Sequence, residues 1–541
     1  MPRLTSGKLL AVRLQTRYNA YDNMINLFPW QRNADAPTGA DYAVLAAGLA
    51  VFAALALATI TQSSVWFDEA FSAYIIQFDF AEIARYTATD VHPPLYYWFL
   101  KLWSMLFGAG ELALRSMSVL FAGVAITFGF LLARRYFGRK AAWLALLFMV
   151  LAPMLVRYGQ EMRMYTLAAA IVMAATYVLA RATESKGRKW WIGYGVLVGL
   201  GMLTHYFTAL VWLAHWVWRL GTAKGGFKAR MQQVFRKEWL WAHAVAVGLF
   251  ALWLPFLARQ LVDVQVNGFW IPPVTPTTIP NFLTNVLFYQ EQVQVTGWLA
   301  LVFLGIAGTL AYVAVRVYRG LAGRQRQMYG LVVVVAFAPM VILFLASMPP
   351  LRPAFVDRYL VATVAAVALF AGITLALSTK YLAKKYLRIG VVAVLTGALL
   401  VGIANVYVLG NYNKNTQSYN GTRQAFQAVA ERGDNVPIIA DSPWLFYEAV
   451  FYETPAHQVY FIDANTEYRY GALDMLKYND MHKIKDVAGF TREHPLVWYF
   501  GRPGDGAMTA PVATWQPVQE VKTADPTTGK PLYRAIQYRV Q

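Results

Sequence analysis

Two adjacent carboxylates, Asp68 and Glu69, follow Trp66-Phe67 directly after the first long apolar segment of the sequence. Carboxylates this close to an apolar segment are costly to hold near lipid, so their placement requires a reason. A solvated loop or a helix cap is one such reason. Catalysis is the other, because a carboxylate in a partly desolvated pocket can accept a proton from a hydroxyl nucleophile. From these two residues alone, both interpretations stay open.

Later polar motifs also fall at the ends of apolar segments. The motif Asp90-Val-His92-Pro-Pro contains two prolines, which cannot continue a helix, so it predicts a fixed turn. Acidic residues in one loop and isolated arginines in others suit a substrate with an anionic phosphate and a hydroxyl acceptor. An arginine at the end of a membrane span is more often an anchor at the lipid headgroups, which is the alternative for each of them. The other motifs of this kind are Gln160-Glu161-Met-Arg163-Met-Tyr165, Thr204-His205-Tyr206 and Asp357-Arg358-Tyr359.

The composition indicates that membrane-spanning helices position these motifs. Of the 541 residues 58% are hydrophobic and 14% are charged, whereas a soluble domain has about 25% charged residues. Several apolar runs exceed about 18 residues, the length needed to cross the hydrocarbon core of a bilayer. The sequence contains no cysteine, which excludes a disulfide framework and a thiolate metal site. Residues 1–41 are polar and basic and lack the short apolar core of a cleaved signal peptide.

Eleven membrane spans are predicted from the apolar segments. The stretch 190–220 is counted as two spans, because one helix of that length would extend about 46 Å, well beyond a hydrocarbon core of about 30 Å. The turn between these two spans is expected at Thr204-His205-Tyr206. The spans cover residues 42–62, 113–133, 141–156, 164–180, 190–204, 206–220, 239–257, 297–315, 329–348, 360–378 and 389–409.

Lysine and arginine alternate between loops in a way that indicates orientation. The N-terminal segment and five alternate loops contain 27 of these residues, whereas the four loops between them contain seven. Because basic loops face the cytoplasm, we expect the N-terminus there, and the motif-bearing loops and the C-terminus outside. The net charge of +19 is therefore interpreted as an orientation signal, and no nucleic-acid partner is expected.

Residues 93–110 are apolar enough to resemble a further span. A crossing there would invert every later loop and would place the basic residues of 134–140 outside, against the charge pattern. The aromatic residues of this segment suit the headgroup zone, so we expect a helix that lies along the membrane interface. The first external loop, residues 63–112, is then long enough to contribute to a site.

The sequence after residue 410 is mixed and charged, and it is long enough for a small domain. Its pattern predicts helices and buried strands, and therefore an extracytoplasmic α/β domain over 411–541 that follows a cytoplasmic segment (1–41) and a transmembrane domain (42–410). Acceptor binding and plain scaffolding are both open as its role. The predicted helices are 421–432 and 443–452, and the predicted strands are 435–441, 457–463, 495–501 and 531–540.

In order and spacing, the motifs resemble those of the GT-C glycosyltransferases. More narrowly, they are similar to the dolichyl-phosphate-mannose-protein mannosyltransferase-like family, which includes bacterial lipid A aminoarabinose transferases. The resemblance covers about residues 42–380 and implies a polytopic α-helical membrane protein of GT-C type. It rests on Trp-Phe-Asp68-Glu69-Ala-Phe-Ser, His92-Pro-Pro-Leu-Tyr-Tyr, Leu-Arg115-Ser, Gln160-Glu161-Met-Arg163-Met-Tyr165, Leu-Thr204-His205-Tyr206 and Asp357-Arg358-Tyr359-Leu.

The resemblance implies an enzyme of the inner or plasma membrane that takes a sugar from a polyprenyl-phosphate carrier. The acceptor would be a hydroxyl of a cell-envelope glycan, a glycolipid or a protein, and attack on the anomeric carbon would invert its configuration. In this family pattern Asp68 is the catalytic base, and Arg163 and Arg358 stabilise the departing phosphate. The remaining expected site residues are Glu69, grouped with Asp68 at the catalytic position; Tyr165, His205 and Tyr359, near the phosphate; and His92, Gln160 and Glu161, which would shape the acceptor side or its loop.

The acceptor, the metal and a rival function stay open at this point. Nothing after residue 410 resembles the lectin-like insert of the eukaryotic protein mannosyltransferases, which leaves the acceptor undetermined. Family members differ in metal use, so a divalent cation such as Mg²⁺ or Mn²⁺ is neither predicted nor excluded, and no other cofactor is predicted. The rival function is a transporter or lipid flippase. Transporters commonly place polar groups near the bilayer midplane and contain internal repeats, whereas the polar motifs here lie at span ends.

Overall fold

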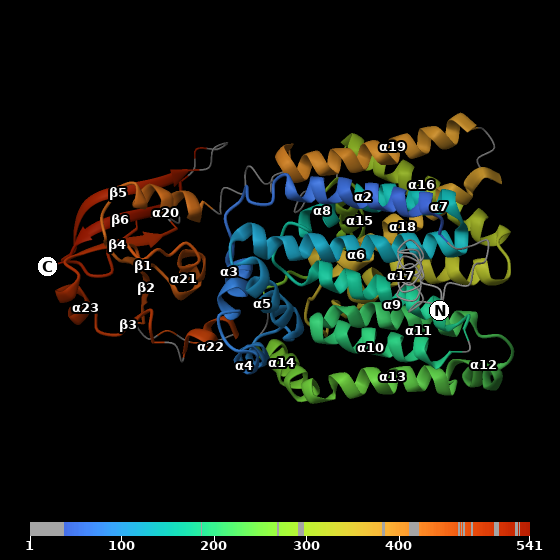
Figure 1. The fold of residues 1–541 in the computed structure, drawn as a ribbon, viewed down its shortest axis with the longest axis horizontal. Coiled ribbons are helices and arrows are strands. Elements are labelled where there is room, and N and C mark those ends of the chain that lie inside the picture. Colours follow the sequence, from blue (N-terminus) through green and yellow to red (C-terminus); the bar gives the residue numbers. More distant parts are fainter. Residues whose placement is uncertain are drawn as a thin grey trace, which may run out of the picture.

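The computed structural model contains a bundle of long helices with a mixed α/β domain at one end (Figure 1). Residues 1–36 of the predicted cytoplasmic segment (1–41) and the predicted domain boundary at residue 410 lie outside the described residues, and α2 begins at Gly39. The structure describes residues 37–540 except 186, 268–269, 290–296, 381–384, 410–420, 464–465, 467, 469–470, 478–479, 503–507, 525–528 and 530.

Eight helical segments of the described chain are long and apolar enough to cross a membrane, and the protein is a multi-pass helical membrane protein. Their burial depends on their place in the bundle: α9 is 89% buried over its apolar window, whereas Ala300–Gly320 is 17% buried and faces outward. The segments are α2 (Gly39–Leu57), α6 (Glu111–Phe137), α9 (Tyr165–Ala182), α13 (Lys237–Phe250) continuing into α14 (Leu254–Asn267), α16 (Gly297–Gly320), α17 (Gly323–Ala346), α18 (Val361–Leu377) and α19 (Lys385–Ala404).

The three other predicted spans are helical but shorter. Residues 141–156 fall on α7 (Arg139–Val150) and α8 (Pro153–Tyr158), and residues 190–220 fall on α10 (Arg188–Thr204) and α11 (Ala209–Thr222). The predicted turn within 190–220 is confirmed, because α10 ends at Thr204 and His205 is extended, with φ of −160°. That these shorter helices cross the membrane stays a prediction, as does the total of eleven spans.

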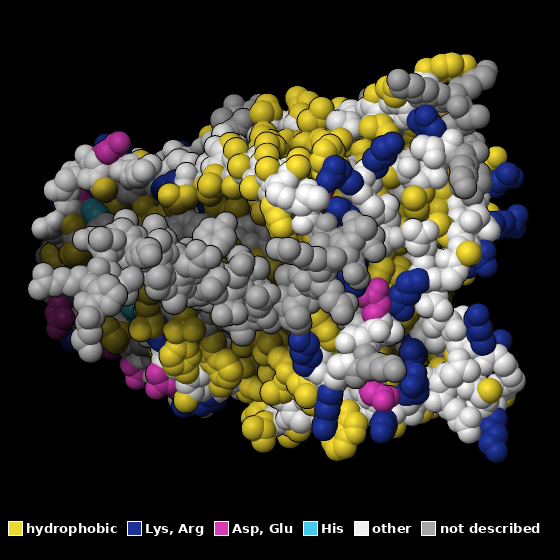
Figure 2. Space-filling model, turned by 45° about the vertical axis from the view of Figure 1, so that its right-hand side comes forward, with side chains coloured by type: hydrophobic (Ala, Val, Ile, Leu, Met, Phe, Trp, Pro, Cys, Tyr) yellow, Lys and Arg dark blue, Asp and Glu magenta, His cyan; other side chains and the backbone are white. Residues whose placement is uncertain are grey.

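Three short helices, α3 (Phe67–Ile75), α4 (Phe80–Thr89) and α5 (Leu95–Phe107), lie between the bundle and the α/β domain (Figure 1). The 13 residues of α5 are too few to cross a bilayer, in agreement with the predicted interfacial helix. Lys and Arg side chains gather toward the opposite end of the bundle (Figure 2). Helix α3, which carries Asp68, and the turn between α4 and α5, which carries His92, thus lie at the end of the bundle away from the main basic surface.

The C-terminal domain contains a six-stranded sheet with the order β3-β2-β1-β4-β6-β5. The first four strands in this order are parallel, and β6 and β5 add two antiparallel strands at one edge. All the predicted strands and helices of the tail are present. The strands are β1 (Ile438–Ala440), β2 (Val459–Ile462), β3 (Lys483–Ile484), β4 (Leu496–Gly501), β5 (Gln516–Ala524) and β6 (Pro531–Arg539), and the helices are α20 (Thr422–Ala430), α21 (Pro443–Val450), α22 (Gly471–Lys477) and α23 (Val487–Glu493).

A glycine lets helices α10 and α13 approach closely. A Cβ atom at Gly195 would lie 2.2 Å from the carbonyl oxygen of Ala242, a distance that no real contact tolerates. Small residues at such crossings are typical of membrane helices, because packing between backbones replaces the hydrophobic effect as the source of association. Gly248 on α13, by contrast, has nothing within 4 Å of its Cβ position.

Gly195→Ala is therefore expected to destabilise the protein, whereas Gly248→Ala is its tolerated control. Overpacking at a rigid backbone contact costs about 1–3 kcal/mol, so thermal unfolding in detergent should begin at a distinctly lower temperature for Gly195→Ala. Equal melting temperatures for both variants would contradict the close crossing of the two helices.

Candidate active site

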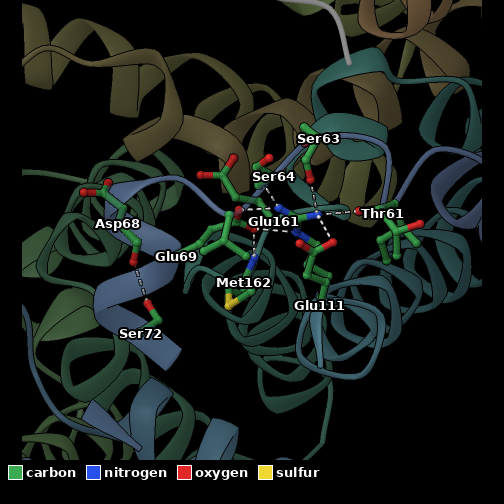
Figure 3. Close-up of polar contacts among 12 residues, drawn as sticks. Thr61, Ser63, Ser64, Asp68, Glu69, Ser72, Glu111, Glu161 and Met162 are labelled. Atoms are coloured by element: carbon green, nitrogen blue, oxygen red, sulfur yellow. Dashed lines mark hydrogen bonds and ion pairs between the residues drawn. The ribbon is translucent and has the colours of Figure 1, made fainter. Parts of the chain in front are cut away.

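The carboxylates of Asp68 and Glu69 occupy the first turn of α3 and point to different sides of it (Figure 3). Adjacent residues of a helix diverge by about 100°, so two neighbouring acids cannot share one environment there. The side chain of Glu69 is 2% exposed and that of Asp68 is 21% exposed. The two residues are therefore separated into one buried acid and one acid that reaches the surface of the site.

Glu69 is bound on its inner side by Arg115 of α6. Arg115 donates from Nε and Nη2 to the two carboxylate oxygens over 2.9 and 2.6 Å, and the backbone N–H of Met162 donates to the same carboxylate over 3.0 Å. Arg115 also donates to the carbonyl oxygens of Ile60, Ser63 and Ser64. This buried pair joins the segment before α3, the start of α6 and the 157–164 loop at one point, which is a positioning role.

Asp68 faces two arginines from two other parts of the chain. Its carboxylate Oδ2 lies 3.7 Å from Nη2 of Arg163 and 4.0 Å from Nη2 of Arg358. Both separations are longer than a hydrogen bond, so the carboxylate interacts with the two guanidiniums through charge and is not tied to either by a hydrogen bond. The arginines that were predicted from two distant motifs are thus brought together around the predicted base.

Arg163 is fixed by a shell of neutral oxygens. Its Nη1 donates to the carbonyl oxygen of Asp68, to Oγ of Ser72 and to Oη of Tyr97, over 3.2, 3.3 and 3.4 Å. Burial raises the pKa of Tyr97, so its hydroxyl remains a neutral acceptor at physiological pH. Ser72 and Tyr97 were not predicted as site residues. Ser72 is one helical turn after Asp68, and Tyr97 follows the His92-Pro-Pro turn, and this spacing is the signal that identifies them.

Arg358 is held by aromatic rings on several sides. Its guanidinium lies 5.1 Å from the ring centre of Trp270 and 5.7 Å from that of Trp66. Such contacts orient an arginine without neutralising its charge. Its Nε–H is buried and has no hydrogen-bond partner among the described residues. Trp270, which is 60% exposed, carries no sequence signal of its role, because it follows α14 far from the other motifs.

Two histidines and two tyrosines lie next to Arg163 and Arg358. Nδ1 of His92 lies 3.0 Å from the Asp90 carboxylate, and Nη2 of Arg163 lies 3.5 Å from its Nε2. His205 is buried, and its pKa is lowered by burial, with His92, Arg163 and Arg358 acting in the same direction. Its ring is therefore neutral at physiological pH. The ring centres of Tyr165 and Tyr359 are 5.8 and 5.3 Å from that of His205.

Gln160 and Glu161 shape the loop that carries Arg163. Oγ1 of Thr59 donates to Gln160 over 2.9 Å, and Nη1 of Arg157 donates to the carboxylate of Glu161 over the same distance. Ser118 of α6 donates to the carbonyl oxygen of Glu161 over 2.6 Å. Both side chains are buried, and their hydrogen-bond partners Thr59 and Arg157 belong to the bundle, which fits the loop-shaping alternative better than contact with an acceptor.

The described residues contain no group of three or more His, Cys, Asp or Glu side chains placed to hold a metal ion. The carboxylate of Asp68 has two guanidiniums as its charged neighbours. The donor set therefore does not fit a divalent cation as a fixed part of the site.

Comparison with known proteins gives a family match for part of the chain and solved structures with a similar fold. Residues 91–258 match the family described as dolichyl-phosphate-mannose-protein mannosyltransferase, which confirms the family resemblance over that segment. No curated protein matches the sequence. The chain is similar in structure to ArnT from Cupriavidus metallidurans in the apo state, with a TM-score of 0.61 and 15% identity over 93% of this chain and 99% of that one.

Further solved structures are also similar. ArnT from Cupriavidus metallidurans bound to undecaprenyl phosphate gives a TM-score of 0.60, with the same identity of 15% and the same coverage of 93% and 99%. Arabinofuranosyltransferase AftD from Mycobacteria gives a TM-score of only 0.43, with 14% identity over 76% of this chain and 30% of that one. The two ArnT structures, which match over 93% of this chain, show that the protein has the ArnT-like GT-C fold.

The buried pair leads to a prediction for Glu69→Gln. Removing one partner of a buried ion pair leaves an uncompensated charge and costs about 3–5 kcal/mol, so this variant should unfold at a markedly lower temperature in detergent. Glu238→Gln is the matched control, because Glu238 is 36% exposed and lies 3.8 Å from an exposed arginine, a contact worth less than about 1 kcal/mol. Similar melting temperatures for the two variants would show that Glu69 does not position α3.

Proposed function

We propose that this chain, whose residues 91–258 match the mannosyltransferase family, is an inverting glycosyltransferase that uses a polyprenyl-phosphate sugar as donor. The observation that carries the proposal is the meeting of Asp68, Arg163 and Arg358 within 4.0 Å at the end of the helical bundle. A proton acceptor and two cations at one place are the groups that transfer from a phosphate-linked sugar to a hydroxyl requires.

The reaction is a single displacement. The acceptor hydroxyl oxygen attacks the anomeric carbon of the sugar, and its proton passes to the carboxylate of Asp68. The bond between the anomeric carbon and the phosphate oxygen breaks, and the phosphate leaves with the electron pair. One carboxylate is sufficient, because attack and departure on opposite faces invert the configuration without a covalent enzyme intermediate.

Donor binding replaces an existing interaction of the two arginines. In the structure, Arg163 and Arg358 both lie within 4.0 Å of one anion, the carboxylate of Asp68. A donor phosphate would take over both guanidiniums and the unsatisfied Nε–H of Arg358. In-line attack requires the acceptor hydroxyl to approach the face of the anomeric carbon opposite the phosphate, and Asp68, released from the two guanidiniums, is then available to accept its proton.

The residues around Asp68 and the two arginines position these groups. Glu69 holds α3 through Arg115, so its contribution is positional, and His205, Tyr165 and Tyr359 form one wall beside the arginines. Because His205 is neutral, it adds no charge that would compete with the guanidiniums for the phosphate. His92 is held by Asp90 and contacts Arg163, which places it at the edge of the same space.

The fold and the placement of the site support the proposed substrate classes. ArnT from Cupriavidus metallidurans is known bound to undecaprenyl phosphate, which supports a polyprenyl carrier for this chain as well. The gathering of basic side chains at the other end of the bundle supports a site at the outer face of the cell membrane. The acceptor is a hydroxyl of a cell-envelope glycan, a glycolipid or a protein.

Asp68→Asn is expected to reduce transfer to a small residual rate. Loss of a general base lowers the rate by about 10²- to 10⁴-fold, and the amide cannot take the proton. Donor-dependent sugar transfer by the purified protein in lipid vesicles is the measurement. Asp263→Asn is the control, since the Asp263 side chain is 58% exposed and lies 3.8 Å from Arg259. Unchanged transfer by Asp68→Asn would remove Asp68 as the base, and sugar uptake without any product would favour a transporter.

Arg358→Gln is expected to lower kcat/KM for the donor, because it removes a cation that binds the phosphate. A charge-assisted hydrogen bond contributes about 1.5–3 kcal/mol, so kcat/KM for the donor should fall about 10- to 100-fold. Arg352→Gln, on the same loop, is the control, because Arg352 donates to the carbonyl oxygen of Gln265 and is exposed. If both variants keep the wild-type kcat/KM, Arg358 does not bind the donor phosphate.

A further inference from the structure

Helix α3 is in contact with the C-terminal domain along one face. Phe67, Phe71 and Tyr74 follow one another at the helical spacing of four and three residues, so they share a face. All three pack against one residue of α21, the buried Tyr447, with ring centres 5.8, 6.1 and 5.3 Å apart. The helix that carries Asp68 is thus held between this aromatic contact and the ion pair of Glu69.

The residues just before α3 are also bound by the C-terminal domain. The hydroxyl of Tyr452 accepts a hydrogen bond of 2.8 Å from the backbone N–H of Val65. Oγ of Ser64 donates to Gln424 over 3.0 Å and accepts from the backbone N–H of Arg423 over 3.2 Å. These bonds matter because Trp66, at the N-cap position of α3, makes no side-chain capping hydrogen bond among the described residues. The start of α3 is therefore fixed from outside the helix.

The C-terminal domain is also connected, through Glu111, to the buried ion pair of Glu69 and Arg115. The hydroxyl of Tyr452 donates a hydrogen bond to the carboxylate of Glu111, and Nη1 of Arg423 donates to the same carboxylate over 2.7 Å. Glu111 in turn lies 3.8 Å from Nη1 of Arg115, which binds Glu69. Burial, with Glu111 acting in the same direction, raises the pKa of Tyr452, so its hydroxyl stays protonated and able to donate.

We infer that Tyr452 is a positioning residue for the catalytic base, and that the C-terminal domain is therefore part of the catalytic apparatus. This inference rests on the proposed function. Tyr452 satisfies the N–H of Val65 with one lone pair and orients Glu111 with its proton, so one hydroxyl fixes both the approach to α3 and the network behind Glu69. Because displacement of a catalytic group by about 1 Å can cost about 10²-fold in rate, loosening this contact reduces turnover without removing any group that touches the substrate.

Tyr452→Phe tests this inference in the full-length protein in lipid vesicles. The ring remains, and only the hydroxyl is lost, so kcat should fall about tenfold, the loss that corresponds to one hydrogen bond, while the KM for the polyprenyl-phosphate donor stays within about twofold. Tyr460→Phe in the same domain is the control, because the hydroxyl of Tyr460 donates to Gln458 at the surface and should be dispensable. Arg423→Lys, which keeps the charge but loses the paired donors to Thr61 and Gln62, should lower kcat in the same way.

A double variant separates positioning from a general loss of structure. If Tyr452 acts only through Asp68, then Asp68→Asn with Tyr452→Phe should show the same residual rate as Asp68→Asn alone. A further proportional loss in the double variant, or wild-type kcat in both Tyr452→Phe and Arg423→Lys, would overturn the inference. If wild-type protein shows no donor-dependent transfer, the proposed function fails instead, so the two failures are distinguishable.

Discussion

The ion pair between Glu69 and Arg115 is the constraint on which the site depends. Both side chains are almost fully buried, and such a pair is stable only where hydrogen bonds satisfy all of its charged atoms. Those bonds come from Met162 and from the carbonyl oxygens of 60–64, which are the two segments that flank the predicted active site. The requirement to satisfy both members of this ion pair therefore brings the loop of Arg163 next to the helix of Asp68, because Met162 of that loop donates to Glu69.

Helix geometry explains why the adjacent acids Asp68 and Glu69 have different roles. One acid turns inward and becomes structural, and the other turns toward Arg163 and Arg358 and remains partly exposed. In this motif Asp68 is therefore the catalytic candidate and Glu69 is a structural residue. The C-terminal domain contacts the opposite face of the same helix through Tyr447 and binds Val65, just before the helix, through Tyr452, so the position of Asp68 is determined by both parts of the protein.

Much of this organisation could be predicted from the sequence, and the rest depends on contacts that leave no local pattern. Apolar periodicity and the Thr204-His205-Tyr206 break predicted the helices, and hydrophobic runs predicted the strands of the tail. The grouping of Asp68 with Arg163 and Arg358 came from family motifs. The structural role of Glu69 could not be predicted, because its partner Arg115 is 46 residues away and lies within an apolar helix. Trp270, Tyr447 and Tyr452 were missed for the same reason: each acts across the fold, and none belongs to a motif.

The anomeric configuration of the product tests the central claim most directly, because a single carboxylate base allows one displacement and no covalent intermediate. The measurement is NMR of the glycosidic linkage formed by the purified protein from a polyprenyl-phosphate sugar of known configuration. The account predicts a product whose configuration is opposite to that of the donor. A product with the configuration of the donor would require a second displacement and a nucleophile on the enzyme, and would contradict the role assigned to Asp68.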